Sequence, residues 1–205
     1  MQRLVVLVDG FNLYHALDNL HRPQLKWLDL WCLGQHLSHP KSEELTAVYY
    51  FSAFANWLPD KAARHRVYVN ALKARGVTIV LGKFKVKDRT CPSCWHHWQG
   101  HEEKETDVNI AIAMLRLAQK DQFDRCILLS RDSDLAPAIR ATRADYPLKT
   151  VTVASLPYRG HSGELVQAAN DKRTLNVGNL TACLLPKIVL DATGAISATR
   201  PTEYD

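Results

Sequence analysis

Aspartates stand at the ends of short apolar runs in this sequence. Asp9 follows the run RLVVLV, Asp132 and Asp134 follow the run CILLS, and Asp107 opens a segment with helical spacing. Clustered carboxylates repel one another, and proteins usually hold them together with a hard divalent cation that prefers oxygen ligands. We therefore predict a Mg²⁺ or Mn²⁺ site at Asp9, Asp107, Asp132 and Asp134.

Each of these residues also has a purely structural interpretation. A single aspartate is most often an N-cap or a turn residue, and Asp132 and Asp134 are well placed to cap the helix that follows them. The turn from Asp9 to Asn12, with Gly10 at its bend, is equally typical of a plain connection between a strand and a helix. The combination of several such positions favours the metal site.

A second group of ligating residues lies between positions 88 and 102. Cys91 and Cys94 form a Cys-x-x-Cys knuckle followed by three histidines, and thiolate and imidazole ligands at this spacing suit tetrahedral Zn²⁺. We predict a structural zinc ion bound by Cys91, Cys94, His96 and His101, with His97 as the alternative to its neighbour His96. A reduced exposed pair of thiols or a redox couple are the other interpretations.

Basic residues precede this knuckle. Lys83, Lys85 and Lys87 alternate along the chain and lead to Arg89. In an extended segment these side chains lie on one side, so they form a stripe that can hold the phosphates of RNA.

The elements that must position these residues alternate along the chain. Short apolar runs typical of buried strands cover residues 3–8, 45–51, 77–81, 126–129 and 150–154. Helical patterns cover residues 61–74, 107–118 and 134–144, and Gly76 is placed to end the first of them. This alternation predicts an α/β fold, a Rossmann-like three-layer sandwich with a mostly parallel central sheet. Ligands of such sheets bind at the carboxyl ends of the strands, where the aspartates stand.

Composition sets the class of protein. The chain has 205 residues, 46% of them hydrophobic and 23% charged, which is typical of one globular domain. Its net charge of +5 favours polyanionic partners only weakly. No apolar run approaches the ~20 residues of a membrane span, and no signal peptide is visible, so we expect a cytoplasmic protein without a membrane partner. Cys32, Cys126 and Cys183 are predicted to be buried small hydrophobic residues.

Three motifs carry a family resemblance. Residues 6–14 (VLVDGFNLY) resemble the first motif of NYN domains, which belong to the PIN-like nuclease superfamily. Residues 102–108 (EEKETDV) and 130–135 (SRDSDL) are similar to the second and third motifs and follow in the same order. In the third motif, Arg131 replaces the usual glycine and Leu135 the usual phenylalanine. The resemblance covers residues 4–170.

The resemblance implies a PIN-like fold and the hydrolysis of RNA phosphodiester bonds at a divalent metal ion. Asp9, Asp107, Asp132 and Asp134 occupy the matching metal-site positions, with Asn12 beside them as a polar positioning group. The family's late acidic residue is best matched by Asp171. Some members carry a similar cysteine-containing insertion before the second motif.

We therefore predict a metal-dependent ribonuclease. The domain covers residues 1–185, with a zinc-knuckle insertion at 88–102 and a C-terminal tail at 186–205. Two alternatives stay open, a noncatalytic RNA- or nucleotide-binding module and a small-molecule enzyme on the same scaffold. Dinucleotide cofactors are not expected, because the turn after the first strand lacks the G-x-G-x-x-G pattern. Homo-oligomerisation also stays open.

Overall fold

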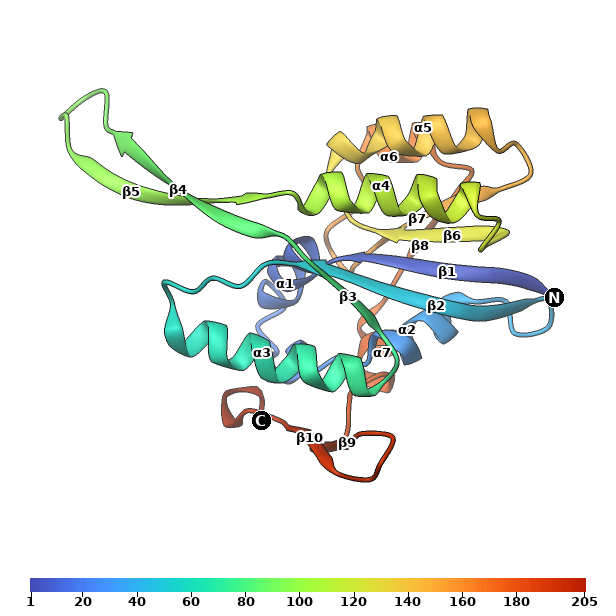
Figure 1. Ribbon diagram of the computed structural model, residues 1–205, viewed down its shortest axis with the longest axis horizontal. Coiled ribbons are helices and arrows are strands. Elements are labelled where there is room, and N and C mark those ends of the chain that lie inside the picture. Colours follow the sequence, from blue (N-terminus) through green and yellow to red (C-terminus); the bar gives the residue numbers. More distant parts are fainter.

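Six parallel strands form the central sheet, in the order β3-β2-β1-β6-β7-β8, in a computed structural model that describes residues 1–205 (Figure 1). The predicted α/β fold is confirmed. Strand β1 is buried from Leu4 to its end, as its continuous apolar run requires of a strand covered on both faces. The strands are β1 (Gln2–Asp9), β2 (Glu43–Ser52), β3 (Thr78–Leu81), β6 (Arg125–Leu129), β7 (Thr150–Ser155) and β8 (Asp171–Thr174).

Helices cover both faces of the sheet. One face carries α1 (Gly10–Asp18), α2 (Leu30–Leu37), α3 (Pro59–Ala74) and α7 (Val177–Ala182), and the other carries α4 (Thr106–Gln119), α5 (Ala136–Asp145) and α6 (Gly163–Ala168) (Figure 1). Successive side chains of β1 point to opposite faces, so Leu4 and Val6 join the first core while Val5 and Leu7 join the second. Short 3₁₀ turns are η1 (Pro23–Lys26), η2 (Ser133–Leu135) and η3 (Thr202–Tyr204).

Local signals determine where the helices begin and end. Helix α3 starts at a proline, whose fixed φ suits the first turn, and Gly76 follows its end with a φ of +82°. The segment predicted as one helix from residue 134 divides into η2 and α5, because Pro137 lies at the beginning of α5. No helix is long and apolar enough to cross a membrane.

A long antiparallel hairpin extends away from the sheet between β3 and α4 (Figure 1). It consists of β4 (Lys83–Thr90) and β5 (His97–Lys104), so it is longer than the expected insertion. Gly82 lies at its base, where a Cβ atom would stand 2.7 Å from the carbonyl oxygen of Lys104. The absence of a side chain at Gly82 therefore allows the hairpin to approach the beginning of α4.

The C-terminal residues are packed against the domain rather than forming the expected tail. Strands β9 (Ile188–Leu190) and β10 (Ile196–Thr199) pair as a second hairpin, and Val189 and Ala198 are buried in the first core. Arg64 of α3 forms an ion pair with Glu203, with 2.8 Å between Nη1 and Oε1. The weak hydrophobic pattern after Pro186 hides this packing, because only single residues of each short strand face the core.

A disulfide joins Cys32 of α2 to Cys183, which directly follows α7. The prediction of buried small hydrophobic residues missed this bond, although Cys183 is buried in the first core as expected and Cys32 is partly buried against it. It is confirmed for Cys126, which is fully buried in β6. The bonded pair is separated by 151 residues, so no local pattern signals it. His36 Nδ1 lies 3.2 Å from Cys183 Sγ.

Candidate functional site

Asp9 ends β1 and caps α1, and it is 2% exposed. Its Oδ1 accepts hydrogen bonds from the backbone N–H groups of Phe11 and Asn12, at 3.1 and 3.0 Å. Its Oδ2 accepts from Asn12 Nδ2 at 2.6 Å and from Ser130 Oγ at 2.7 Å. Burial raises the pKa of Asp9, and the charge of Asp132 adds to this, although the hydrogen bonds oppose the shift. Asn12 is thus a positioning group for Asp9.

Asp132 and Asp134 lie beside Asp9, at the end of the adjacent strand β6. The hydroxyl of Ser130 connects the two strand ends, since it donates to Asp9 and accepts the Asp132 N–H at 3.0 Å. Asp132 Oδ1 in turn accepts the N–H of Asp134 at 3.0 Å and caps η2. The capping role expected of this segment is therefore present together with the clustering of its carboxylates. Asp134 itself is exposed.

Asp107 reaches the same place from the first turn of α4. Desolvation raises its pKa to about 6, and the charges of Asp132, Asp9 and Asp134 contribute in the same direction. Glu105, two residues before Asp107, has a φ of +79°, in the left-handed region that few residues other than glycine adopt. This turn between β5 and α4 is where the chain redirects Asp107 toward the strand ends.

Glu103 joins this group, and residue types alone did not single it out. Desolvation, with smaller contributions from the charges of Asp9 and Asp107, raises the pKa of Glu103 to about 7, against a hydrogen bond from the Thr106 hydroxyl. The available signal is the acidic stretch EEKE before Asp107. Only the hairpin register distinguishes Glu103 from Glu102, which forms an ion pair with Lys104 at 3.0 Å.

The structure thus gathers five carboxyl groups at one edge of the sheet. Three of them, Asp9, Glu103 and Asp107, have raised pKa values, because burial disfavours the charged form and the neighbouring carboxylates add repulsion. Carboxylate oxygens in this number fit a hard divalent cation. The ligand atoms of Cys32, His36 and Cys183 lie within 4.8 Å of one another, but the two cysteines are joined by the disulfide. The carboxylate oxygens of the acidic group are more widely spaced than these atoms.

The family model described as NYN domain matches residues 3–176. This chain belongs to the NYN domain family. The family lies in the PIN-like nuclease superfamily, whose members generally act on nucleic acids.

The NYN domain is 27% identical to 6-hydroxy-3-succinoylpyridine 3-monooxygenase HspA of Pseudomonas putida (strain DSM 28022 / S16), over 91% of this chain and 71% of that protein. It also resembles the crystal structure of a protein of unknown function from Vibrio parahaemolyticus RIMD 2210633, with a TM-score of 0.56 and 22% identity. That match covers 90% of this chain and 96% of the other. It shows the fold alone.

Asp171 does not reach the acidic group of the NYN domain. It begins β8 and pairs with Thr152, near the start of β7, whereas the aspartates stand at the carboxyl ends of the strands. The expectation that Asp171 supplies the late acidic residue was therefore wrong. Arg131, in contrast, is exposed beside the site, and it lines a small pocket together with Asn12 and Arg159.

One face of the projecting hairpin is basic. Lys83, Lys85, Lys87 and Arg89 alternate along β4, so their side chains share this face, and all four are exposed. Some of this charge is compensated within the hairpin, because Lys83 pairs with Glu105 and Lys87 lies 3.8 Å from Glu102. Lys85 has no such ion pair. The predicted stripe therefore exists as an exposed surface of the hairpin, on the face opposite Glu103.

The four predicted zinc ligands are not brought together. Cys91 and Cys94 lie in the turn at the tip of the hairpin, where N–H groups of Cys94 and Ser93 lower the pKa of the Cys91 thiol. His101 pairs with Val86, four ladder positions from the last pair at the tip, and stacks on Trp57 with 3.7 Å between ring centroids. At ~3.4 Å for each residue of a strand, four ladder positions put His101 too far along the hairpin to share a metal ion with Cys91 and Cys94.

Proposed function

We propose that this NYN domain is a metal-dependent ribonuclease that hydrolyses phosphodiester bonds at the acidic group. One observation supports this most strongly: carboxyl groups carried by β1, β5, α4 and the segment after β6 converge at the carboxyl edge of the sheet, where burial and, to a smaller extent, their mutual repulsion raise the pKa values of three of them. A site of this kind stabilises a divalent cation, and ligands of parallel sheets bind at this edge.

Each side chain has a defined task in this proposal. Asp9, Asp107, Asp132 and Asp134 would hold Mg²⁺ or Mn²⁺, and Glu103 is close enough to take part. When bound, such an ion polarises a phosphoryl oxygen and lowers the pKa of water. Asn12 and Ser130 each donate one hydrogen bond to Oδ2 of Asp9 and so orient its carboxylate. No nucleophile from the protein is required.

The basic face of the hairpin would bind the RNA backbone. Lysine and arginine attract phosphates without reading sequence, and the hairpin leads directly into α4, which carries Asp107. We therefore expect affinity for single-stranded or structured RNA through Lys83, Lys85, Lys87 and Arg89. The repulsion between the phosphates and the carboxylates makes RNA binding at the site depend on the metal ion.

Cleavage of a labelled single-stranded RNA tests the proposal. We expect cleavage with Mn²⁺ or Mg²⁺ but not with EDTA. The substitution Asp132→Asn should slow it more than about 100-fold, because even outer partners of metal ligands are worth about 10–100-fold. Asp145→Asn, at the far end of α5, is the matched control and should leave the rate unchanged. RNA binding by anisotropy without any cleavage would instead support the noncatalytic module.

We further propose that the tip of the hairpin binds zinc through Cys91 and Cys94. The N–H groups that stabilise the Cys91 thiolate favour a metal-bound turn, and His96 and His97 are the adjacent imidazoles. Elemental analysis of the purified protein should find zinc, and Cys94→Ser should remove it while Cys126→Ser does not. Zinc retained in Cys94→Ser would contradict this assignment.

A second candidate function is an enzyme acting on a small ring compound. The observation that favours it is the relationship to 6-hydroxy-3-succinoylpyridine 3-monooxygenase, which spans 91% of this chain. Incubation with 6-hydroxy-3-succinoylpyridine, ¹⁸O₂ and a two-electron donor such as NADH, followed by mass spectrometry, tests it directly, because a monooxygenase consumes both O₂ and a reductant. A product that contains ¹⁸O would support the second candidate, and unchanged compound would count against it.

A further inference from the structure

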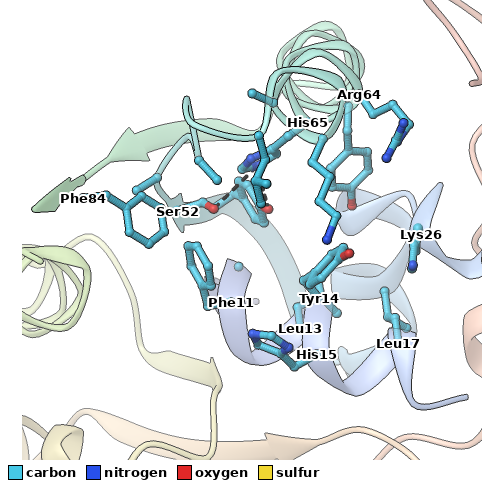
Figure 2. Close-up of a pocket in the computed structure, with 18 of the residues that line it drawn as sticks. Phe11, Leu13, Tyr14, His15, Leu17, Lys26, Ser52, Arg64, His65 and Phe84 are labelled. Carbon is cyan, nitrogen blue, oxygen red and sulfur yellow. Dashed lines mark hydrogen bonds between the residues drawn. The ribbon is translucent and has the colours of Figure 1, made fainter. Parts of the chain in front are cut away.

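A cavity of about 360 Å³ lies between α1, α3 and the end of β2, and the proposed hydrolysis does not use it (Figure 2). Its volume is in the range of small-molecule sites, about 300–1,000 Å³. Phe11 and Tyr14 of α1 face His65 and Arg64 of α3 across the open space, and Phe84 closes one end (Figure 2).

Aromatic rings form much of the wall. Phe84 packs edge-on against both Phe11 and Trp57, with 5.4 and 4.5 Å between ring centroids. Trp57 and Tyr14 are each 38% exposed at the mouth, although solvent exposure of such large rings is unfavourable. A planar apolar group entering the cavity would cover these rings and pack against them.

Cations outnumber carboxylates in the lining. Lys26, Lys61 and Arg64 line the cavity, whereas Glu203 is the one carboxylate that does. Arg64 is paired with Glu203, and Lys26 with Asp18 at 2.5 Å. Lys61 has no carboxylate within the 4.0 Å limit of an ion pair. The mouth therefore has positive charge that the protein itself leaves uncompensated.

The inner end of the cavity is polar but neutral. His65 Nε2 lies 3.2 Å from the Tyr50 hydroxyl and 3.5 Å from the Ser52 hydroxyl. Burial, with a smaller effect of Arg66, lowers the pKa of His65 to about 4, so the ring is uncharged at neutral pH. These groups can exchange hydrogen bonds with an uncharged polar substituent of a ligand but offer no charge to bind an anion. An anionic group is thus favoured at the mouth.

The cavity is separate from the acidic group. The two are divided by the first turn of α1, where Gly10 lies so close to Tyr50 that a Cβ atom would stand 2.7 Å from its ring. Asp9 points toward Asn12 and Ser130, whereas Gly10 and Phe11 line the cavity.

We propose that this cavity binds a small aromatic anion, with its ring between Phe11, Tyr14 and Trp57 and its charged group beside Lys61. An aromatic carboxylate and a nucleoside monophosphate share this chemistry. The cavity is too small for a longer polyanion to enter.

Calorimetric titration of the full chain tests the proposal with three probes. These are 2-naphthoate, its neutral analogue 2-naphthamide, and adenosine 5′-monophosphate, all in EDTA so that the acidic group contributes no metal-bound ligand. We expect at least one of the two anions to bind, and 2-naphthamide to bind at least about fivefold more weakly than 2-naphthoate. Which anion binds distinguishes a carboxylate ligand from a nucleotide.

Four variants locate the binding. Lys61→Met keeps the apolar stem of the side chain and should lower the affinity for the anion about fivefold, an effect typical of one partly exposed ion pair. Lys120→Met, at the far end of α4, should not change it. Ala62→Phe fills the cavity from α3 and should abolish binding of the anion. Asp132→Asn should bind normally, so this inference can hold even if the ribonuclease proposal fails.

Two results would overturn the inference. The first is absence of binding by both anions to the folded protein. The second is binding that neither Lys61→Met nor Ala62→Phe weakens, because it would place the anion elsewhere on the basic surface.

Discussion

Replacing Glu103 by Gln tests the electrostatic account of the acidic group without any assay of activity. The substitution removes the negative charge but keeps the oxygen that accepts the Thr106 hydroxyl. Because burial and neighbouring aspartates raise the pKa of Glu103 from 4.5 to about 7, the folded protein binds more protons than the unfolded chain between these pH values. Stability of the wild type therefore falls as pH rises through this window.

The magnitude follows from the two pKa values. At 1.36 kcal/mol for each pKa unit, the change from 4.5 to about 7 corresponds to at most about 3 kcal/mol above pH 7. Glu103→Gln should recover up to this amount at pH 8 and almost none at pH 4.5, in urea unfolding with EDTA. Saturating Mn²⁺ should stabilise the wild type more than the variant, since the cation offsets the repulsion.

Glu102→Gln provides the matched control on the same strand. Ion pairs with Lys104 and Lys87 lower the pKa of Glu102, so its neutralisation should give no gain in stability at pH 8. A gain that is the same for both variants, or a gain for Glu103→Gln that does not change between pH 4.5 and 8, would refute the reasoning.

Three other substitutions, one of them with a matched control, test the fold and the RNA surface. Glu43→Gln leaves Arg125 buried beside a neutral partner and should cost about 3–5 kcal/mol in urea unfolding at pH 7. Desolvation raises the pKa of Glu43, but the hydrogen bonds and charge of Arg125 together with the His39 N–H outweigh it and lower the pKa, so the difference should shrink as pH falls below 4.5. Gly10→Ala places a Cβ atom 2.6 Å from a backbone oxygen of β2 and should lower the thermal midpoint, whereas Gly163→Ala, with nothing within 4 Å, should not. Lys85→Ala should make the plot of log K for RNA binding against log salt concentration less steep by about 0.7.

Local patterns were enough to predict the parts of the site that lie on single elements. The continuous apolar run of β1 places Asp9 at its carboxyl end, and the periodicity of α4 places Asp107 in its first turn. Parallel neighbours then bring these ends together, because β1 pairs with β6 and thereby aligns Asp9 with the segment that holds Asp132. Strand order was the only additional knowledge required.

The missed features depend on contacts between distant segments. The Cys32–Cys183 bond forms across 151 residues. The exclusion of His101 from the tip follows from the hairpin register, which sequence spacing within a short window does not reveal. The aromatic cavity likewise needs α1, α3, β4 and the C-terminal turn together, so Tyr204 could not be assigned to it from the sequence.

The two faces of the β4–β5 hairpin connect the acidic group, the cavity and the basic surface. Residues directly opposite in the ladder share a face, and Phe84 pairs with Glu103 while Lys85 pairs with Glu102. One face therefore sends Glu103 toward the aspartates and Phe84 over the cavity, and the other carries the lysines. A shift of the register by one residue would place Glu103 and Phe84 on opposite faces, so one of the two would turn away from its site. The hairpin thus supports both proposed sites through a single register, and Gly82 at its base keeps it against α4.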